Sequence, residues 1–96
     1  MQDRQAQDIA EAVLLWLCAQ PEQLGVFLAA TGADVDGVRT ALQAGASDPG
    51  LASAALDFVL MRDDTVMDAA AALDMPPDRL VMAAAVLAGT AGMHWT

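Results

Sequence analysis

A repeated cadence along the chain constrains the fold more than any other feature. Runs rich in Ala and Leu follow prolines at Gln20-Pro21-Glu22, Ser47-Asp48-Pro49 and Pro76-Pro77-Asp78. Proline suits the first turn of a helix because the N–H that it lacks would have no partner there. Two of the runs stop at Gly32 and Gly45, and glycine readily adopts the left-handed conformation that closes a helix. The cadence therefore predicts an all-α protein made of short helices.

Apolar periodicity within these runs predicts a compact bundle of five or six short helices. Short helices with short connections favour orthogonal or irregular packing over a long coiled coil. Asp34, Asp63 and Asp64 are the expected helix caps. We expect one helical domain over residues 1–89 and a flexible C-terminal tail over 90–96, which lacks periodicity. The expected helices start near Asp3, at Pro21, after Asp34, at Pro49, after Asp63 and Asp64, and after Pro76. The expected ends are Ala19, Gly32, Gly45 and, for the last helix, Gly89.

A weak internal repeat suggests two similar helical hairpins. Residues 24–42 align without gaps on residues 66–84, and both copies read as helix, tight turn, helix. In this alignment Gly32 matches Asp74. Two copies are too few for a solenoid. Chance similarity between two alanine-rich segments is the alternative explanation.

The charge balance excludes some classes of partner. The chain has thirteen acidic residues, four Arg and no Lys, which gives a net charge of −9. Such a charge repels polyanions, so we expect neither nucleic acid nor an anionic membrane as a partner. The acids are spread along the whole sequence, which favours a solvated acidic surface over one dedicated patch.

The compartment follows from one cysteine and one apolar run. Cys18 has no second cysteine to pair with, which fits a reducing compartment. The apolar run 13–17 follows an acidic segment, which is the wrong charge for a secretion signal. It is also far shorter than the roughly 20 residues that span a bilayer. We expect a cytoplasmic protein.

Two familiar motifs fail on their residue requirements. A DNA-binding helix-turn-helix needs a basic footprint, and the first hairpin offers only Arg39, Thr40 and Gln43 for it. Residues 34–37 hint at a calcium loop, but its first and last ligand positions would fall on Gly32 and Gln43. An EF-hand needs an acid at the first position and a glutamate at the last. The first segment is better explained as an ordinary helical hairpin, and residues 34–37 are better explained as a helix cap with its first turn.

The remaining reactive side chains predict no enzyme. His94 stands in the expected tail, without the rigid setting that a catalytic imidazole needs. Cys18 is expected at the C-terminal end of a helix, which disfavours a thiolate. Asp64 and Asp68 are i, i+4 neighbours that could attract a cation, but capping and a solvated face explain them as well. We predict no catalytic, cofactor-binding or metal-binding residues and no cofactor.

Several segments, taken in order and spacing, carry a resemblance to a known family. They are Phe27-Leu28-Ala29-Ala30-Thr31-Gly32, Val38-Arg39, Asp48-Pro49, Leu56-Asp57-Phe58-Val59-Leu60 and the Pro76-Pro77 helix start. The chain resembles a family of short alphaproteobacterial proteins known only as a domain of unknown function, over roughly residues 9–89. The resemblance implies an all-helical cytoplasmic protein and supplies no activity or ligand. The sequence departs from the family's pattern at Ala33 and at Leu73-Asp74-Met75.

Two functions remain open on this sequence. The first is a non-enzymatic protein-interaction or adaptor module with an unknown protein partner. The alternative is an acidic regulator that mimics nucleic acid by occupying the basic site of a partner.

Four residues are candidates for specific contacts, and three aromatic residues are candidates for the core. No charged residue occurs between Leu80 and Trp95, and a helix apolar all round must be central or meet another molecule. Met82 and Val86 are therefore the candidate face for a homodimer or partner contact. Arg39 and Asp57 are the candidate structural ion pair. The expected aromatic core residues are Trp16, Phe27 and Phe58.

Overall fold

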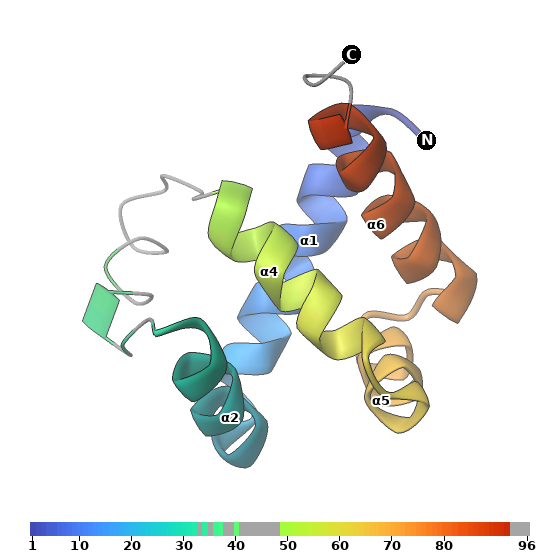
Figure 1. Cartoon of the computed structure of the whole chain (residues 1–96). Helices are drawn as coiled ribbons and strands as arrows, with labels where there is room; N and C mark the ends of the chain where they lie inside the picture. Colours follow the sequence, from blue (N-terminus) through green and yellow to red (C-terminus); the bar gives the residue numbers. More distant parts are fainter. Residues whose placement is uncertain (33, 35, 38–39, 41–48, 93–96) are drawn as a thin grey trace.

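Five helices form the part of the chain that the structure describes. This computed structural model describes residues 1–32, 34, 36–37, 40 and 49–92. Its helices are α1 (Asp3–Cys18), α2 (Pro21–Thr31), α4 (Pro49–Leu60), α5 (Asp63–Ala72) and α6 (Pro77–Gly92) (Figure 1). No strand occurs among these residues. The all-α bundle predicted from the helix cadence is confirmed.

Helix α1 is the centre of the bundle. It packs against each of the other four helices, most extensively against α4 and α6, and α4 crosses it obliquely (Figure 1). Its buried residues recur every three or four positions, which places them on one broad face. They are Ala6, Ile9, Ala10, Val13, Leu14 and Leu17. Helix α6 packs directly on α1 and leaves Val81 and Met82 exposed.

Small side chains let the helices approach each other closely. Seven of the sixteen apolar residues that form the core are alanines of α1 and α4–α6, and alanine adds little volume at a helix contact. Phe27 is the one buried residue of α2. Its ring meets the ring of Phe58 edge to face, with centroids 5.4 Å apart. The prediction of a core position is confirmed for Phe27, whereas Trp16 and Phe58 lie half-buried against the core.

The link between α1 and α2 is tight and sharply bent. Gln20 is extended and Pro21 begins α2, so the two helices follow each other at a bend of 115°. Within the described residues no single helix is long and apolar enough to span a membrane. Helices α1 and α2 reach that length and apolarity only together, as this bent pair.

The matched positions of the internal repeat share a backbone conformation. Gly32 ends α2 with a φ of 76°, in the left-handed region. Asp74, its match, has a φ of 54° and is the one described residue other than glycine with a positive φ. After α5, the N–H of Met75 donates to the carbonyl of Ala70 and the N–H of Asp74 donates to that of Ala71. These two bonds form a Schellman motif, so both matched helix ends depend on a left-handed residue.

Three predicted helix ends can be compared with the structure. The Asp34 carboxylate accepts the N–H of Gly37 at 2.5 Å, as expected of a cap. Asp63 and Asp64 were expected to cap α5, but they lie inside its first turn and Arg62 is the N-cap residue. Helix α6 continues to Gly92, three residues beyond its expected end at Gly89. Gly89 does not have a positive φ, and glycine in a helical conformation weakens a helix without ending it.

Two further predictions lie outside the described residues. They are the helix stop at Gly45 and the tail residues 93–96.

Candidate partner-binding groove

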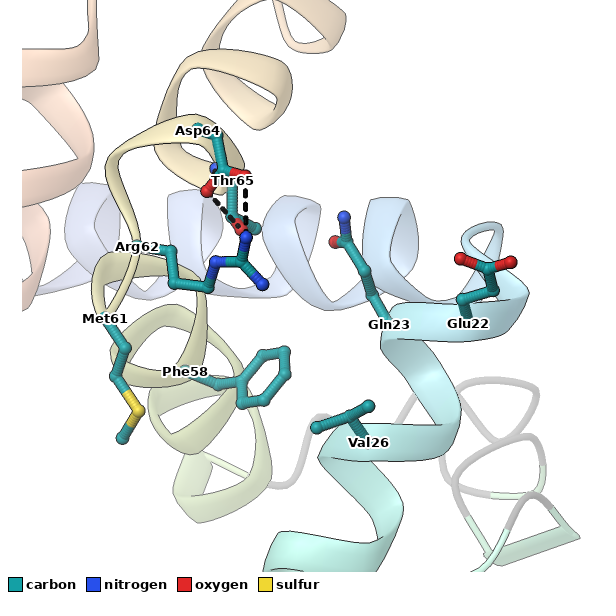
Figure 2. Close-up of a pocket in the computed structure, with 8 residues that line it drawn as sticks. All are labelled: Glu22, Gln23, Val26, Phe58, Met61, Arg62, Asp64 and Thr65. Carbon is teal, nitrogen blue, oxygen red and sulfur yellow. Dashed lines mark hydrogen bonds and ion pairs between the residues drawn. The ribbon is translucent and has the colours of Figure 1, made fainter.

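A groove opens between α2 and the junction of α4 with α5. It has a volume of about 450 Å³. Its walls come from two segments that are far apart in the sequence, the first half of α2 and the end of α4 with the start of α5 (Figure 2). We call it the α2–α5 groove. Its lining residues are Glu22, Gln23, Val26, Phe58, Met61, Arg62, Asp64 and Thr65.

One side of the α2–α5 groove is apolar and open to solvent. The side chains of Val26 and Phe58 point toward each other across it (Figure 2). Val26 is 60% exposed and Met61 is 77% exposed. Phe58 is held in place from behind by the buried ring of Phe27. The groove therefore offers apolar surface that the bundle itself does not cover.

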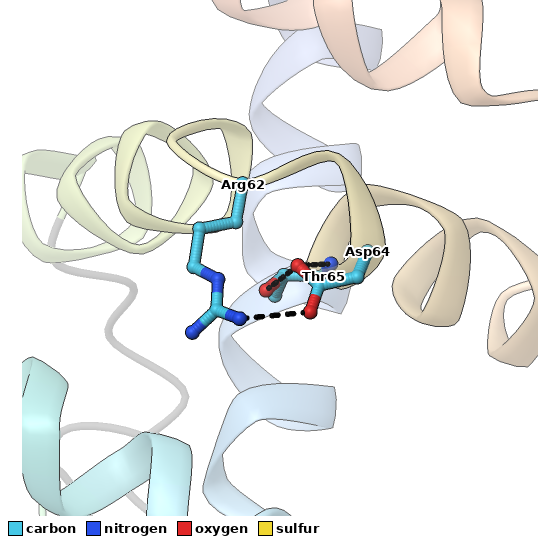
Figure 3. A network of polar contacts seen from close by, with 3 residues as sticks. All are labelled: Arg62, Asp64 and Thr65. Atoms are coloured by element: carbon cyan, nitrogen blue, oxygen red, sulfur yellow. Dashed lines mark hydrogen bonds and ion pairs between the residues drawn. The ribbon is translucent and has the colours of Figure 1, made fainter.

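Next to this apolar side, at the junction of α4 with α5, the groove carries the ion pair between Arg62 and Asp64. Arg62 Nη2 donates to Asp64 Oδ2 at 2.9 Å, and both side chains are largely exposed (Figure 3). The other carboxylate oxygen of Asp64 accepts the backbone N–H of Thr65 at 2.9 Å and its hydroxyl at 3.5 Å. Because Asp64 lies in the first turn of α5, the helix dipole also favours its negative charge. These contacts hold the guanidinium of Arg62 at the groove.

Two polar side chains of α2 complete the lining. Glu22 is exposed in the first turn of α2 and forms no ion pair with any described residue. Gln23 extends toward the side of the groove where Arg62 lies (Figure 2). Gln23 Oε1 is buried and accepts no hydrogen bond from the described residues. An unpaired buried carbonyl oxygen is unfavourable by about 1–3 kcal/mol, so this atom would gain from a donor.

The predicted contact face on α6 is only partly available. Met82 is 49% exposed, whereas Val86 is half-buried and packs against the core. Val81 is the exposed neighbour of Met82, at 54%. The bundle covers Val86 because α6 turns that side toward its neighbours. A contact on this face would therefore use Met82 together with Val81.

The predicted ion pair between Arg39 and Asp57 stays a prediction. Asp57 lies exposed on α4, and Arg39 lies outside the described residues.

Cys18 ends α1 and is partly buried, and burial raises the pKa of its thiol above the ordinary value of 9.0. The neutral thiol is a weak nucleophile. No three His, Cys, Asp or Glu side chains come together as metal ligands in this part of the chain. Asp64, one of the two acids considered for a cation, instead pairs with Arg62.

Sequence reasoning missed the α2–α5 groove because its walls meet only in the folded chain. Val26 and Met61 stand within apolar runs, where nothing distinguishes an exposed residue from a buried one. One signal was present in the sequence. Met61-Arg62-Asp63-Asp64 places an apolar side chain and a charge cluster together at a helix boundary.

Comparison with known proteins gives one match. The family described as "Protein of unknown function (DUF3572)" matches residues 3–90. No curated protein and no solved structure matches the chain.

Proposed function

The chain belongs to the DUF3572 family, and we propose that it is a non-enzymatic protein-interaction module. The α2–α5 groove is the observation that supports this proposal most directly. It combines exposed apolar side chains with polar groups at its edge, the combination that protein interfaces use. Its exposed valine and methionine would be covered on binding.

Affinity capture from the native host tests the proposal. The full chain serves as bait, and captured proteins are identified by mass spectrometry. We expect a protein that is retained in near-stoichiometric amount and is released by excess untagged chain. Capture that equals that of an unrelated helical protein of similar net charge would contradict the proposal.

The acidic composition supports a second candidate, mimicry of nucleic acid. With thirteen acids and four Arg, the chain carries a negative charge that a basic binding site of a partner would attract. A mimic binds through its carboxylates, so its binding should fall steeply as salt concentration rises. The captured partner should also bind nucleic acid and release it when the chain is added. Binding that persists in high salt and leaves nucleic acid bound would favour the interaction module.

We also propose Met82 as a self-association contact, since its side chain is exposed on a helix that carries no charge beyond Arg79 among the described residues. Sedimentation equilibrium should show an average mass that rises with concentration. Met82→Glu should remove this rise because association would bury the new charge. The control is Met67→Glu, at a similarly exposed methionine of α5. A wild-type chain that stays monomeric at high concentration would exclude the contact.

A further inference from the structure

We infer that the α2–α5 groove binds an amphipathic, basic segment of a partner protein. The aliphatic side chains of this segment would lie on Val26, Phe58 and Met61. Its arginine or lysine would lie beside Glu22 and Gln23. This inference rests on the proposed function as an interaction module, and it adds the site and the chemistry of the partner.

The size and shape of the apolar side suit side chains of a helix or an extended peptide. A volume of about 450 Å³ lies within the range of pockets that bind small ligands, and it is enough for a few side chains. Phe58 is a rigid surface because Phe27 supports it from the core. A rigid aromatic wall beside two exposed aliphatic side chains is typical of grooves that receive amphipathic segments.

The charges at the groove favour a cation. Arg62 and Asp64 neutralise each other at 2.9 Å, so Glu22 leaves the lining with a net charge of −1 by formal count of Glu22, Arg62 and Asp64. Beyond the groove, the net charge of −9 attracts cations toward the whole molecule. An acidic segment would be repelled both by the lining of the groove and by the charge of the whole molecule. A basic segment would be attracted by both.

Gln23 adds a specific reason for a hydrogen-bond donor. Its Oε1 has no partner among the described residues and is closed off from solvent, so a donor reaches it only when the side chain turns toward the groove. Arginine offers five N–H donors and lysine three, and neither has an acceptor. A guanidinium at the groove could donate to Gln23 Oε1 once that side chain turns toward it. A neutral apolar segment would leave this oxygen unpaired.

A titration with defined peptides tests the inference. The probe is a short amphipathic helical peptide with leucine on one face and arginine on the other. Its partner probe carries citrulline in place of each arginine, which keeps the shape and removes the charge. Binding is followed by ¹H–¹⁵N NMR of the full chain. We expect the arginine peptide to shift the Gln23 side-chain amide and the backbone amides of Val26, Arg62 and Thr65. The citrulline peptide should bind about fivefold more weakly, the effect of one exposed ion pair.

Matched variants separate the groove from the rest of the surface. Val26→Ser should weaken binding of the arginine peptide about fivefold, because one largely exposed valine loses its apolar contact. Val81→Ser, at a similarly exposed valine of α6, should leave binding unchanged. Glu22→Gln should weaken binding about two- to fivefold. Asp68→Asn, at an exposed acid outside the groove, should change it by much less.

The outcomes distinguish this inference from the proposed function. Shifts that cluster on α6, equal binding of the citrulline peptide, or tighter binding of a glutamate version would each overturn the inference. If a partner captured from the host binds Val26→Ser and Glu22→Gln as well as wild type, the module stands and the groove assignment fails. If capture yields no partner while the arginine peptide still binds the groove, the proposed function fails instead.

Discussion

At the scale of single residues, Phe27 is the side chain that fixes α2 to the core. It is fully buried, whereas Phe58 is half-buried on the groove side of the same aromatic pair. Phe27→Ala should lower the free energy of unfolding by about 3–5 kcal/mol, and Phe58→Ala by about 1–2 kcal/mol because less of its surface is buried. Urea denaturation of both variants and of the double variant measures the interaction free energy between the two rings. We expect this interaction free energy to be about 0.5–1.5 kcal/mol for the edge-to-face contact. If the losses of the two single variants simply add in the double variant, this contact contributes nothing and the prediction is wrong.

Backbone conformation sets a second prediction at this scale. Asp74 has a positive φ, which an L-residue adopts at a cost of about 1 kcal/mol relative to glycine. Asp74→Gly should therefore stabilise the fold by about 1 kcal/mol. Gly32→Ala should destabilise it by a similar amount, although a Cβ there meets no atom within 4 Å.

Gly25→Ala is the control for this prediction. Gly25 lies inside α2, and a Cβ there also meets no atom within 4 Å. Since its φ is not positive, alanine should stabilise α2 by about 0.5–1 kcal/mol. Thermal denaturation of the three variants measures the effects. Equal effects of Gly25→Ala and Gly32→Ala would refute the argument from φ.

At the scale of elements, α1 provides the sharpest test because two adjacent leucines differ in burial. Leu14 is 3% exposed and Leu15 is 56% exposed. Leu14→Ala should lower the free energy of unfolding by about 2–5 kcal/mol, whereas Leu15→Ala should change it by about 0.5 kcal/mol or less. Helix propensity is the same in both substitutions, so the difference reports packing alone. Similar losses, measured by urea denaturation, would mean that another molecule or a second copy covers Leu15.

At the scale of the whole molecule, repulsion among the acids opposes folding. The longest extent of the molecule is 35 Å, and charges interact over about 30 Å at 0.01 M salt but only about 8 Å at 0.15 M. Raising the salt over this range should therefore raise the melting temperature by about 5 °C, which corresponds to about 1 kcal/mol for a domain of this size. A neutral osmolyte of equal osmolarity controls for general solvent effects. A melting temperature that stays constant or falls would show that repulsion is not a major term.

The sequence by itself determined where most helices begin and end. Proline at a helix start and glycine at a helix end act on the backbone locally, so Pro21, Gly32 and Pro77 mark their boundaries without knowledge of the fold. These features depend on neighbours within one or two turns, which a sequence displays directly.

Only the tertiary structure decided which apolar residues stay exposed and where the groove lies. Leu14 and Leu15 are the same residue type, and their burial depends on which helix packs against which side. The α2–α5 groove exists because α2 packs near the end of α4, bringing Glu22 and Val26 close to residues 58–65. Contacts between segments so far apart follow from the packing of the complete bundle, because no local pattern specifies the angle at which two helices meet.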